Sequence, residues 1–219
     1  MFSIRTLLFI CEGSTASVGP PTDTTLKGTP MTETTRTING NSLPLPGTYS
    51  LDLSHSAVQF SVRHMMVSKV RGSFDSFSGS ITIAEDPTAS SVNVEVDLNS
   101  INTNDENRDG HLKSADFFNT ETTPKMTFVS TSVEPKGSDW LVTGDLTIAG
   151  TTKPTTLKVE FEGATVDPWG NLRIGFSASG EINREDFGVS WNQALETGGV
   201  LVGKDVKISI DAEAVTPIS

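Results

Sequence analysis

The sequence predicts an all-β protein, an antiparallel barrel of about eight strands with one or two short helices inserted between strands. Three observations favour this fold class. Apolar and polar residues alternate with a period of two almost everywhere between Tyr49 and Val215, turns of hairpin length separate the alternating segments, and only Asn102 to Phe118 clearly interrupts them. Period-two alternation is typical of strands that bury one face. Closing such strands into a barrel removes the exposed edges that invite aggregation.

Residues 1–46 are predicted to form a disordered tail, and residues 47–216 a single barrel domain. Thr, Pro, Ser and Gly dominate the tail, so little apolar surface is present to offset chain entropy. The apolar run from Thr6 to Cys11 is short for the core of a secretory signal, and Glu12 ends it. Met31 is an alternative to Met1 as the first residue of the protein. We therefore expect a cytoplasmic protein, with export to the periplasm or outside the cell as the alternative.

The alternating segments are the predicted strands. His55 to His64 places Val58, Phe60 and Val62 on one face and polar side chains on the other. Ser91 to Asn99 repeats this pattern. The later apolar faces comprise Met126 and Phe128; Trp140, Val142, Leu146 and Ile148; Leu157, Val159 and Phe161; Leu172, Ile174, Phe176 and Ala178; and Val206, Ile208 and Ile210.

The interrupting segment predicts a short helix. Thr103 and Glu106 have the spacing of a capping box, in which each side chain satisfies a free backbone N–H at a helix start. Leu112, Phe117 and Phe118 give the end of this segment an apolar side. We expect that side to cover an apolar space, while the charged side ties the ends of the strands together.

The interior of the barrel is the candidate binding site. An eight-stranded barrel can be filled by its own side chains or can hold one elongated ligand. Its inward positions mix large and small residues, so complete filling is not assured, and a solid barrel acting as an acidic interaction module stays an alternative. The candidate lining residues are Val58, Phe60, Val62, Phe74, Phe117, Phe118, Phe128, Trp140, Val142, Phe161, Ile174, Phe176 and Ala178.

Charge and composition exclude several classes of partner. Sixteen basic and 27 acidic side chains give a net charge of -11, and residues 1–47 carry three of each sign, so the acidic excess lies on the barrel. Nucleic acid and anionic membranes should be repelled. The single cysteine, Cys11, permits neither an internal disulfide nor a thiolate metal cluster. No run approaches the ~20 apolar residues of a membrane span, so we expect no stable membrane insertion.

Several motifs together resemble one family. They are Tyr49 to Ser56, Val58 to His64, Gly72 to Gly79, Arg108 to Phe118, Gly144 to Lys153, Asn183 to Gly188 with Trp191, and Val202 to Val206. In this order they resemble the YceI-like family of polyisoprenoid-binding proteins over about residues 47–215. The resemblance implies a lipocalin-like extended barrel whose apolar pore holds an isoprenoid chain, such as that of a quinone or polyprenyl lipid. It implies binding or transport without catalysis and without a cofactor.

The polar residues of these motifs are expected to be structural or to contact a lipid headgroup. They are His55, His64, Arg108, Asp109, His111 and Arg184. His55 and His64 are too far apart along one strand to share a metal ion, so no metal site is expected. An enzyme at the barrel mouth, hydrolase-type or metal-dependent and using His111 with Asp109, is kept as an alternative. The oligomeric state is left open, with a homodimer as one option.

Overall fold

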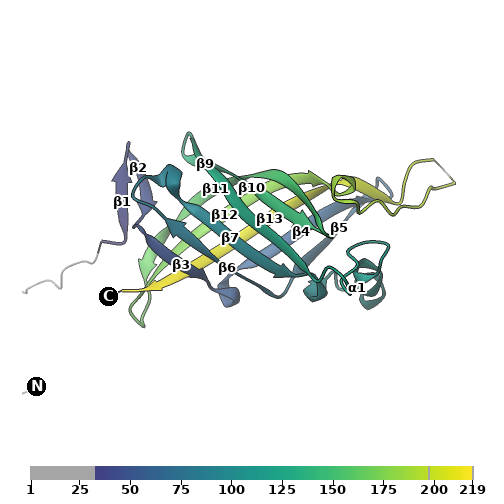
Figure 1. The fold of residues 1–219 in the computed structure, drawn as a ribbon, viewed down its shortest axis with the longest axis horizontal. Coiled ribbons are helices and arrows are strands. Elements are labelled where there is room, and N and C mark those ends of the chain that lie inside the picture. The colour runs from purple at the N-terminus through teal and green to yellow at the C-terminus, as the bar shows by residue number, and fades with distance from the viewer. Residues whose placement is uncertain (1–32, 197, 219) are drawn as a thin grey trace, which may run out of the picture. The chain divides into compact units, whose positions relative to one another are not determined.

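The structure is a computed structural model that describes residues 33–196 and 198–218. Its strands form a small hairpin and one large antiparallel sheet (Figure 1). The hairpin consists of β1 (Thr35–Ile38) and β2 (Asn41–Pro44). The strands of the large sheet are β3 (Gly47–Leu51), β4 (Ala57–His64), β5 (Ser68–Phe74), β6 (Phe77–Ile83), β7 (Ser91–Asp97), β8 (Ile101–Asn102), β9 (Lys125–Lys136), β10 (Asp139–Ile148), β11 (Thr151–Val166), β12 (Asn171–Asn183) and β13 (Val202–Pro217).

The large sheet closes on itself as an eight-stranded barrel. Around the ring the strands follow the order β12-β11-β10-β9-β7-β6-β3-β13, and β13 pairs again with β12. The other three strands extend members of this ring. β4 continues β3 and pairs with β13, and β5, which pairs with β4, continues into β6. β8 continues β7 and pairs with β5. Neighbouring strands are antiparallel throughout, and the predicted fold class is confirmed.

Short turns capped by aspartates interrupt two of these strands. Asp52 precedes the 3₁₀ helix η1 (Leu53–His55), and its carboxylate accepts a hydrogen bond from the Ser54 N–H. Asp97 caps η3 (Leu98–Ser100) in the same way through the Asn99 N–H. Because an aspartate can satisfy a backbone N–H two residues ahead, it stabilises a turn in competition with the strand.

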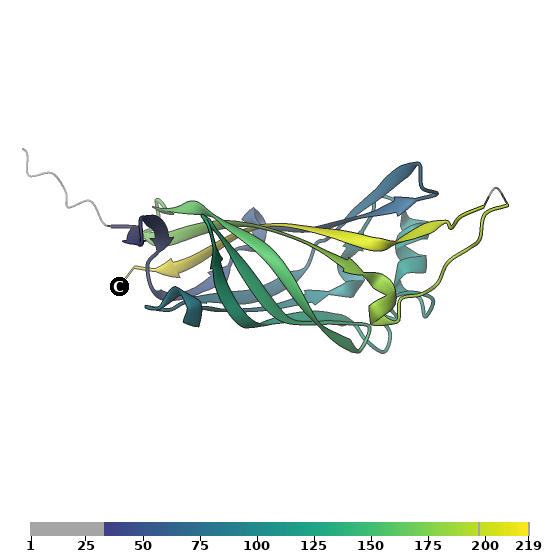
Figure 2. The ribbon, with the colours of Figure 1, turned by 90° about the horizontal axis from the view of Figure 1, so that it is seen from above.

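One helix, α1 (Glu106–Lys113), lies between β8 and β9 at one end of the barrel, which we call the α1 end (Figures 1 and 2). The predicted helix is present, but the predicted cap is wrong. Asp105 is the N-cap, and its carboxylate accepts the Arg108 N–H at 3.0 Å. Thr103 instead donates its N–H and hydroxyl to Asp109. A left-handed Asn104, with φ of 60°, separates Thr103 from the helix and explains the displaced cap.

Part of the expected tail is ordered. Residues 1–32 lie outside the described part of the chain, but β1 and β2 form a hairpin where we expected no regular structure. Asn39 and Gly40 connect them, with φ values of 52° and 83°, which is the backbone geometry that Asn-Gly turns favour in hairpins. Arg36 donates to the backbone oxygens of Ala84 and Glu85, and Leu43 is buried. These tertiary contacts hold the hairpin in place, although the composition of the segment is typical of a disordered tail.

The core consists of three buried clusters. At the α1 end, Leu146, Ile148, Phe187 and Val189 form the first. The second, formed by Phe74, Phe77, Val96, Leu98 and Ile101, lies where β5 pairs with β8 and β6 with β7. The third, built around Tyr49, Leu172, Ile174 and Ala214, lies where β3, β12 and β13 approach the opposite end. In residues 33–196 and 198–218, no helix has the length and apolar character needed to cross a membrane.

Candidate functional site: an apolar cavity inside the barrel

The inward faces of the strands enclose a cavity of about 300 Å³. Its walls are almost entirely aliphatic and aromatic, because the alternation turns one apolar side chain in two toward the interior. Several of these side chains, including Phe60, Phe128 and Phe176, are only partly buried although they point into the barrel. Their remaining accessible surface faces the cavity, so the barrel is not filled by its own side chains.

Twelve of the 13 predicted lining residues border this cavity: Val58, Phe60, Val62, Phe74, Phe117, Phe118, Phe128, Trp140, Val142, Phe161, Phe176 and Ala178. The exception is Ile174. Its side chain is 1% exposed and packs in the cluster with Tyr49, Leu172 and Ala214. The alternation assigned Ile174 to the inner face, but the large Tyr49 ring fills that section of the barrel, and the lining assignment is wrong there.

Some walls of the cavity were not predicted from the sequence. Leu43 and Pro44 of β2 line it, although they belong to the segment predicted as a tail. Asn39-Gly40 between two short extended segments was the signal that could have revealed this hairpin. Leu157, Ile208 and Ile210 also line the cavity; their alternation was recognised, but they were not included among the lining residues.

The segment that contains α1 covers the cavity at one end. Leu112, Phe117 and Phe118 line the cavity there, as the sequence predicted. His111 supports this cover: its ring lies edge-on to Phe117 and Trp191, with ring centroids 5.0 and 4.8 Å away. Its Nε2 lies 2.9 Å from the Asp116 carboxylate. The cover is therefore fixed by an aromatic cluster that includes the histidine.

The residues of the alternative catalytic pair bind different partners. Asp109 accepts hydrogen bonds from Thr103, and Arg108 donates Nε to the Thr103 hydroxyl and Nη2 to its carbonyl, each at 2.7 Å. His111 is bonded to Asp116 instead of Asp109. Arg108 and Asp109 thus fasten α1 to the end of β8, and the geometry gives His111 no contact with Asp109.

Arg184 is one of two arginines, with Arg36, that line the cavity and carry a buried nitrogen without a hydrogen-bond partner among the described residues. It begins the 3₁₀ helix η4 (Arg184–Phe187), lines the cavity, and is only 6% exposed. Nε donates to the Gly203 carbonyl at 2.9 Å and Nη1 to the Val189 carbonyl at 2.6 Å. Nη2 is buried and has no hydrogen-bond partner among the described residues. Burial lowers the pKa of this guanidinium. Its Nη2 is an unused donor beside an apolar space.

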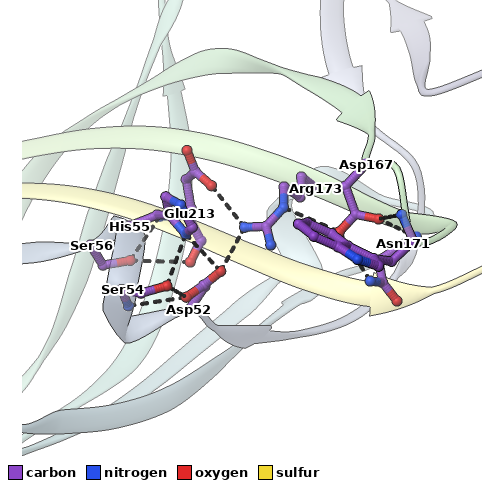
Figure 3. A network of polar contacts seen from close by, with 9 residues as sticks. Asp52, Ser54, His55, Ser56, Asp167, Asn171, Arg173 and Glu213 are labelled. Carbon is purple, nitrogen blue, oxygen red and sulfur yellow. Dashed lines mark hydrogen bonds and ion pairs between the residues drawn. The ribbon is translucent and has the colours of Figure 1, made fainter.

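A network of charged residues lies toward the opposite end of the barrel (Figure 3). Arg173 Nη1 is 2.6 Å from Asp52 and 2.9 Å from Glu213, and Nε is 3.3 Å from Asp167. His55 Nδ1 lies 3.0 Å from Asp52. The network joins η1, β12, β13 and the turn after β11. His55 therefore belongs to this network, while His64 lies at the far end of β4.

The same network contains a group of possible metal ligands. Asp52, His55 and Glu213 offer ligand atoms that all lie within 4.8 Å of one another. Arg173 already places a cation between the two carboxylates. A metal ion would have to displace or approach this guanidinium, so like-charge repulsion disfavours one. The geometry is that of an ion-pair clamp.

The clamp predicts how stability depends on pH. Hydrogen bonds from Ser54, Arg173 and His55 hold the pKa of Asp52 well below its usual range. Burial would raise the pKa of Asp167, but hydrogen bonds from Asn171 and Trp169 outweigh it and lower the pKa. Carboxylates with a depressed native pKa stabilise the fold above the unfolded pKa, about 4, and lose this contribution as pH falls further.

We therefore expect Asp52→Asn to melt below the unchanged protein at pH 7, with a gap that narrows as pH falls below about 4. Thermal unfolding followed by circular dichroism across this pH range measures the gap. Asp145→Asn is the control, because Asp145 is exposed and makes no ion pair within the described residues. A gap for Asp52→Asn that stays constant down to pH 2.5, or about that value, would contradict the ion-pair account.

Comparison with known proteins identifies one family. The model of the YceI-like domain matches residues 49–214. The UPF0312 protein SAS2572 of Staphylococcus aureus is 45% identical over 167 residues, which cover 75% of this chain and 95% of that protein.

Solved structures agree with that assignment. The structure of BcnA from Burkholderia cenocepacia matches with a TM-score of 0.66 at 25% identity, covering 75% of this chain and 99% of BcnA. A polyisoprenoid binding domain from Saccharophagus degradans matches in fold, with a TM-score of 0.56 at 20% identity, covering 77% of this chain and 98% of that domain. The motifs, the closed barrel and these matches lead to one conclusion: the chain belongs to the YceI-like family.

Proposed function

We propose that this protein binds a polyisoprenoid lipid, such as a quinone or a polyprenyl lipid, inside the barrel and sequesters or transports it. The observation that carries the proposal is the apolar cavity, whose lining includes Phe60, Phe128, Phe161 and Phe176. The polyisoprenoid-binding domain of Saccharophagus degradans, which shares the fold, supports this choice of ligand.

The energetics of the cavity favour a long hydrocarbon chain. Transfer of apolar groups from water to an apolar site contributes about 0.8 kcal/mol per methylene. Nearly every wall of the cavity is aliphatic or aromatic, so a polar or charged ligand of the same size would lose hydration without gaining hydrogen bonds. Branched isoprene units can pack against both the rings and the valine and isoleucine side chains of the lining.

The polar end of the lipid is assigned to Arg184. Nη2 of this residue is a buried donor without a partner among the described residues, and an unused buried donor costs free energy that a bound acceptor restores. Arg36 Nε is a second such donor at the cavity, but the Arg36 guanidinium is already paired with the Glu85 carboxylate. A quinone carbonyl or a phosphate oxygen supplies such an acceptor. We therefore place the headgroup at the α1 end, beside η4, with the isoprenoid chain extending along the barrel.

Two alternatives are less well supported. A catalytic site at the barrel mouth would need His111 and Asp109 to cooperate, but they hydrogen-bond to Asp116 and Thr103. A solid interaction module does not agree with a cavity of about 300 Å³. We propose a binding protein without a catalytic step.

Tryptophan fluorescence provides a direct test of quinone binding. Trp191 packs on Phe117 at the α1 end of the cavity, with ring centroids 5.3 Å apart, whereas Trp169 is 80% exposed on the turn between β11 and β12. A quinone with an isoprenoid tail should quench the fluorescence in a saturable way, and Trp191→Phe should remove most of the quenched signal, because the headgroup is placed at the α1 end. Trp169→Phe, the matched control, should leave the quenching intact. Quenching that depends on Trp169, or that does not saturate, would argue against binding inside the barrel.

A further inference from the structure

The hairpin that joins β4 to β5 exposes an apolar tip. Met65, Met66 and Val67 are 43%, 62% and 82% exposed. They are consecutive in the chain and form the turn between β4 and β5, and this hairpin lies at the α1 end (Figure 2). Most of the surface of Met66 and Val67 therefore gains nothing from packing in the fold.

The backbone conformation of this tip is unfavourable for methionine. The Val67 N–H donates to the His64 carbonyl at 3.1 Å, and the two residues between them, Met65 and Met66, have φ values of 50° and 62°. Turns with two left-handed residues favour Asn-Gly, because a side chain with a Cβ is disfavoured at positive φ. Strain of this kind is found where a side chain has a role beyond stability.

The strands behind the tip carry unpaired positive charge. Residues 57–74 contain no Asp or Glu but include Arg63, Lys69 and Arg71, all exposed. None of these three makes an ion pair in the described part of the chain, whereas Lys125, Lys158, Lys204 and Lys207 each pair with a carboxylate. Arg63 and Lys69 even face each other across the hairpin, and like charges in that arrangement destabilise a sheet.

The tip also lies next to the cavity. Val62 and Val202 line the cavity, and Val202 pairs with His64 at the base of the tip. The Met65 N–H donates to the Leu201 carbonyl at 2.8 Å, which joins the tip to the start of β13. A surface contacted by the tip would therefore lie beside the α1 end of the cavity.

We propose that the β4–β5 tip docks reversibly on an anionic lipid bilayer. Met65, Met66 and Val67 enter the interface between headgroups and acyl chains, while Arg63, Lys69 and Arg71 contact the lipid phosphates. The combination of shallow apolar insertion and basic charge is the chemistry of peripheral membrane binding. This docking does not depend on which lipid occupies the cavity.

The net charge of -11 does not prevent this contact. Exposed charges more than about 8–10 Å apart are largely screened at physiological ionic strength, so the charge nearest the bilayer dominates the interaction. At the tip that charge is positive. The expectation from overall composition, that anionic membranes are repelled, describes the remainder of the barrel surface.

Co-sedimentation of the full chain with lipid vesicles tests the proposal. The protein should sediment with vesicles of phosphatidylcholine and phosphatidylglycerol, and much less with phosphatidylcholine alone. Each cation removed, in Arg63→Gln or Lys69→Gln, should weaken binding about fivefold at low salt, and added salt should reduce these differences. Failure of the unchanged protein to bind the anionic vesicles would overturn the proposal.

A double variant separates docking from folding. Replacing Met65 by Asn and Met66 by Gly supplies the preferred turn residues, so the melting temperature should be equal or higher while vesicle binding falls at least about tenfold. Trp169→Ala, which removes an exposed aromatic side chain at the opposite end, is the matched control and should bind like the unchanged protein. Full binding by the double variant, or loss of binding by Trp169→Ala, would contradict docking through this tip.

Two more measurements distinguish docking from self-association and from lipid binding in the cavity. If the tip instead joins two copies of the chain, sedimentation velocity would show a dimer that the double variant loses, and the bilayer assignment would be wrong. Quinone quenching of the tryptophan fluorescence in solution should be unchanged in the double variant. Failure of docking and failure of lipid binding in the cavity are therefore distinguishable outcomes.

Discussion

Replacing Ala178 by Trp should abolish lipid binding while the barrel stays folded. Ala178 lines the cavity on β12, between Val159 of β11 and Ile210 of β13. An indole ring at this position would occupy space needed by the isoprenoid chain. Excluding only two methylenes costs about 1.6 kcal/mol, which corresponds to a loss of affinity of more than about tenfold. Titration with a quinone and thermal unfolding of the lipid-free protein measure the two effects.

Ser179→Trp is the matched control for this substitution. Ser179 is the next residue of the same strand, and its exposed side chain points to the outer face. The same ring placed there should leave binding intact. If the interior were solid, Ala178→Trp would overpack it at a cost of about 1–3 kcal/mol. A fall in melting temperature of roughly 2–4 °C per kcal/mol would reveal this. Strong destabilisation without prior lipid binding would contradict the cavity.

Replacing Arg184 by Met should weaken binding of lipids with a polar headgroup selectively. A hydrogen bond from a charged donor contributes about 1.5–3 kcal/mol, so affinity for a quinone should fall roughly 10- to 150-fold. Squalene, an isoprenoid hydrocarbon without a headgroup, should bind nearly as before. Competition between each ligand and a fluorescent fatty acid measures both affinities.

The same change should also reduce stability, because the Gly203 and Val189 carbonyls lose their donors. Each unsatisfied buried carbonyl costs about 1–3 kcal/mol. Arg184→Lys is the companion variant: it keeps the positive charge and one donor, and should recover part of the quinone affinity. Equal losses for quinone and squalene in Arg184→Met would show that Arg184 shapes the barrel without holding the headgroup.

Period-two alternation was enough to predict most of the barrel and most of its lining. Alternation identifies the inward residues because each strand buries only one face. The register of neighbouring strands then follows from the short turns that join them. Phe60, Phe128, Phe161 and Phe176 were all assigned to the cavity in this way. Ile174 shows the limit of the method: alternation assigns a face but does not say which sections of the interior are filled.

Other features depend on contacts that no local pattern contains. The β1–β2 hairpin is held by Arg36, whose partners Ala84 and Glu85 lie almost fifty residues away. The helix cap moved from Thr103 to Asp105 because Asp109 binds the Thr103 N–H and hydroxyl. Arg184 could be singled out by its motif, but its free Nη2 appears only when Gly203 and Val189 occupy the other two nitrogens.

Native mass spectrometry of the gently purified full chain tests the central proposal most directly. We expect a protein carrying one lipid, released on activation and identified as an isoprenoid by fragmentation of the extracted ligand. Ser179→Trp should carry the same lipid, and Ala178→Trp should carry none. A lipid-free mass for the unchanged protein that persists after incubation with quinones and polyprenyl lipids, or the same bound lipid in Ala178→Trp, would contradict binding inside the barrel.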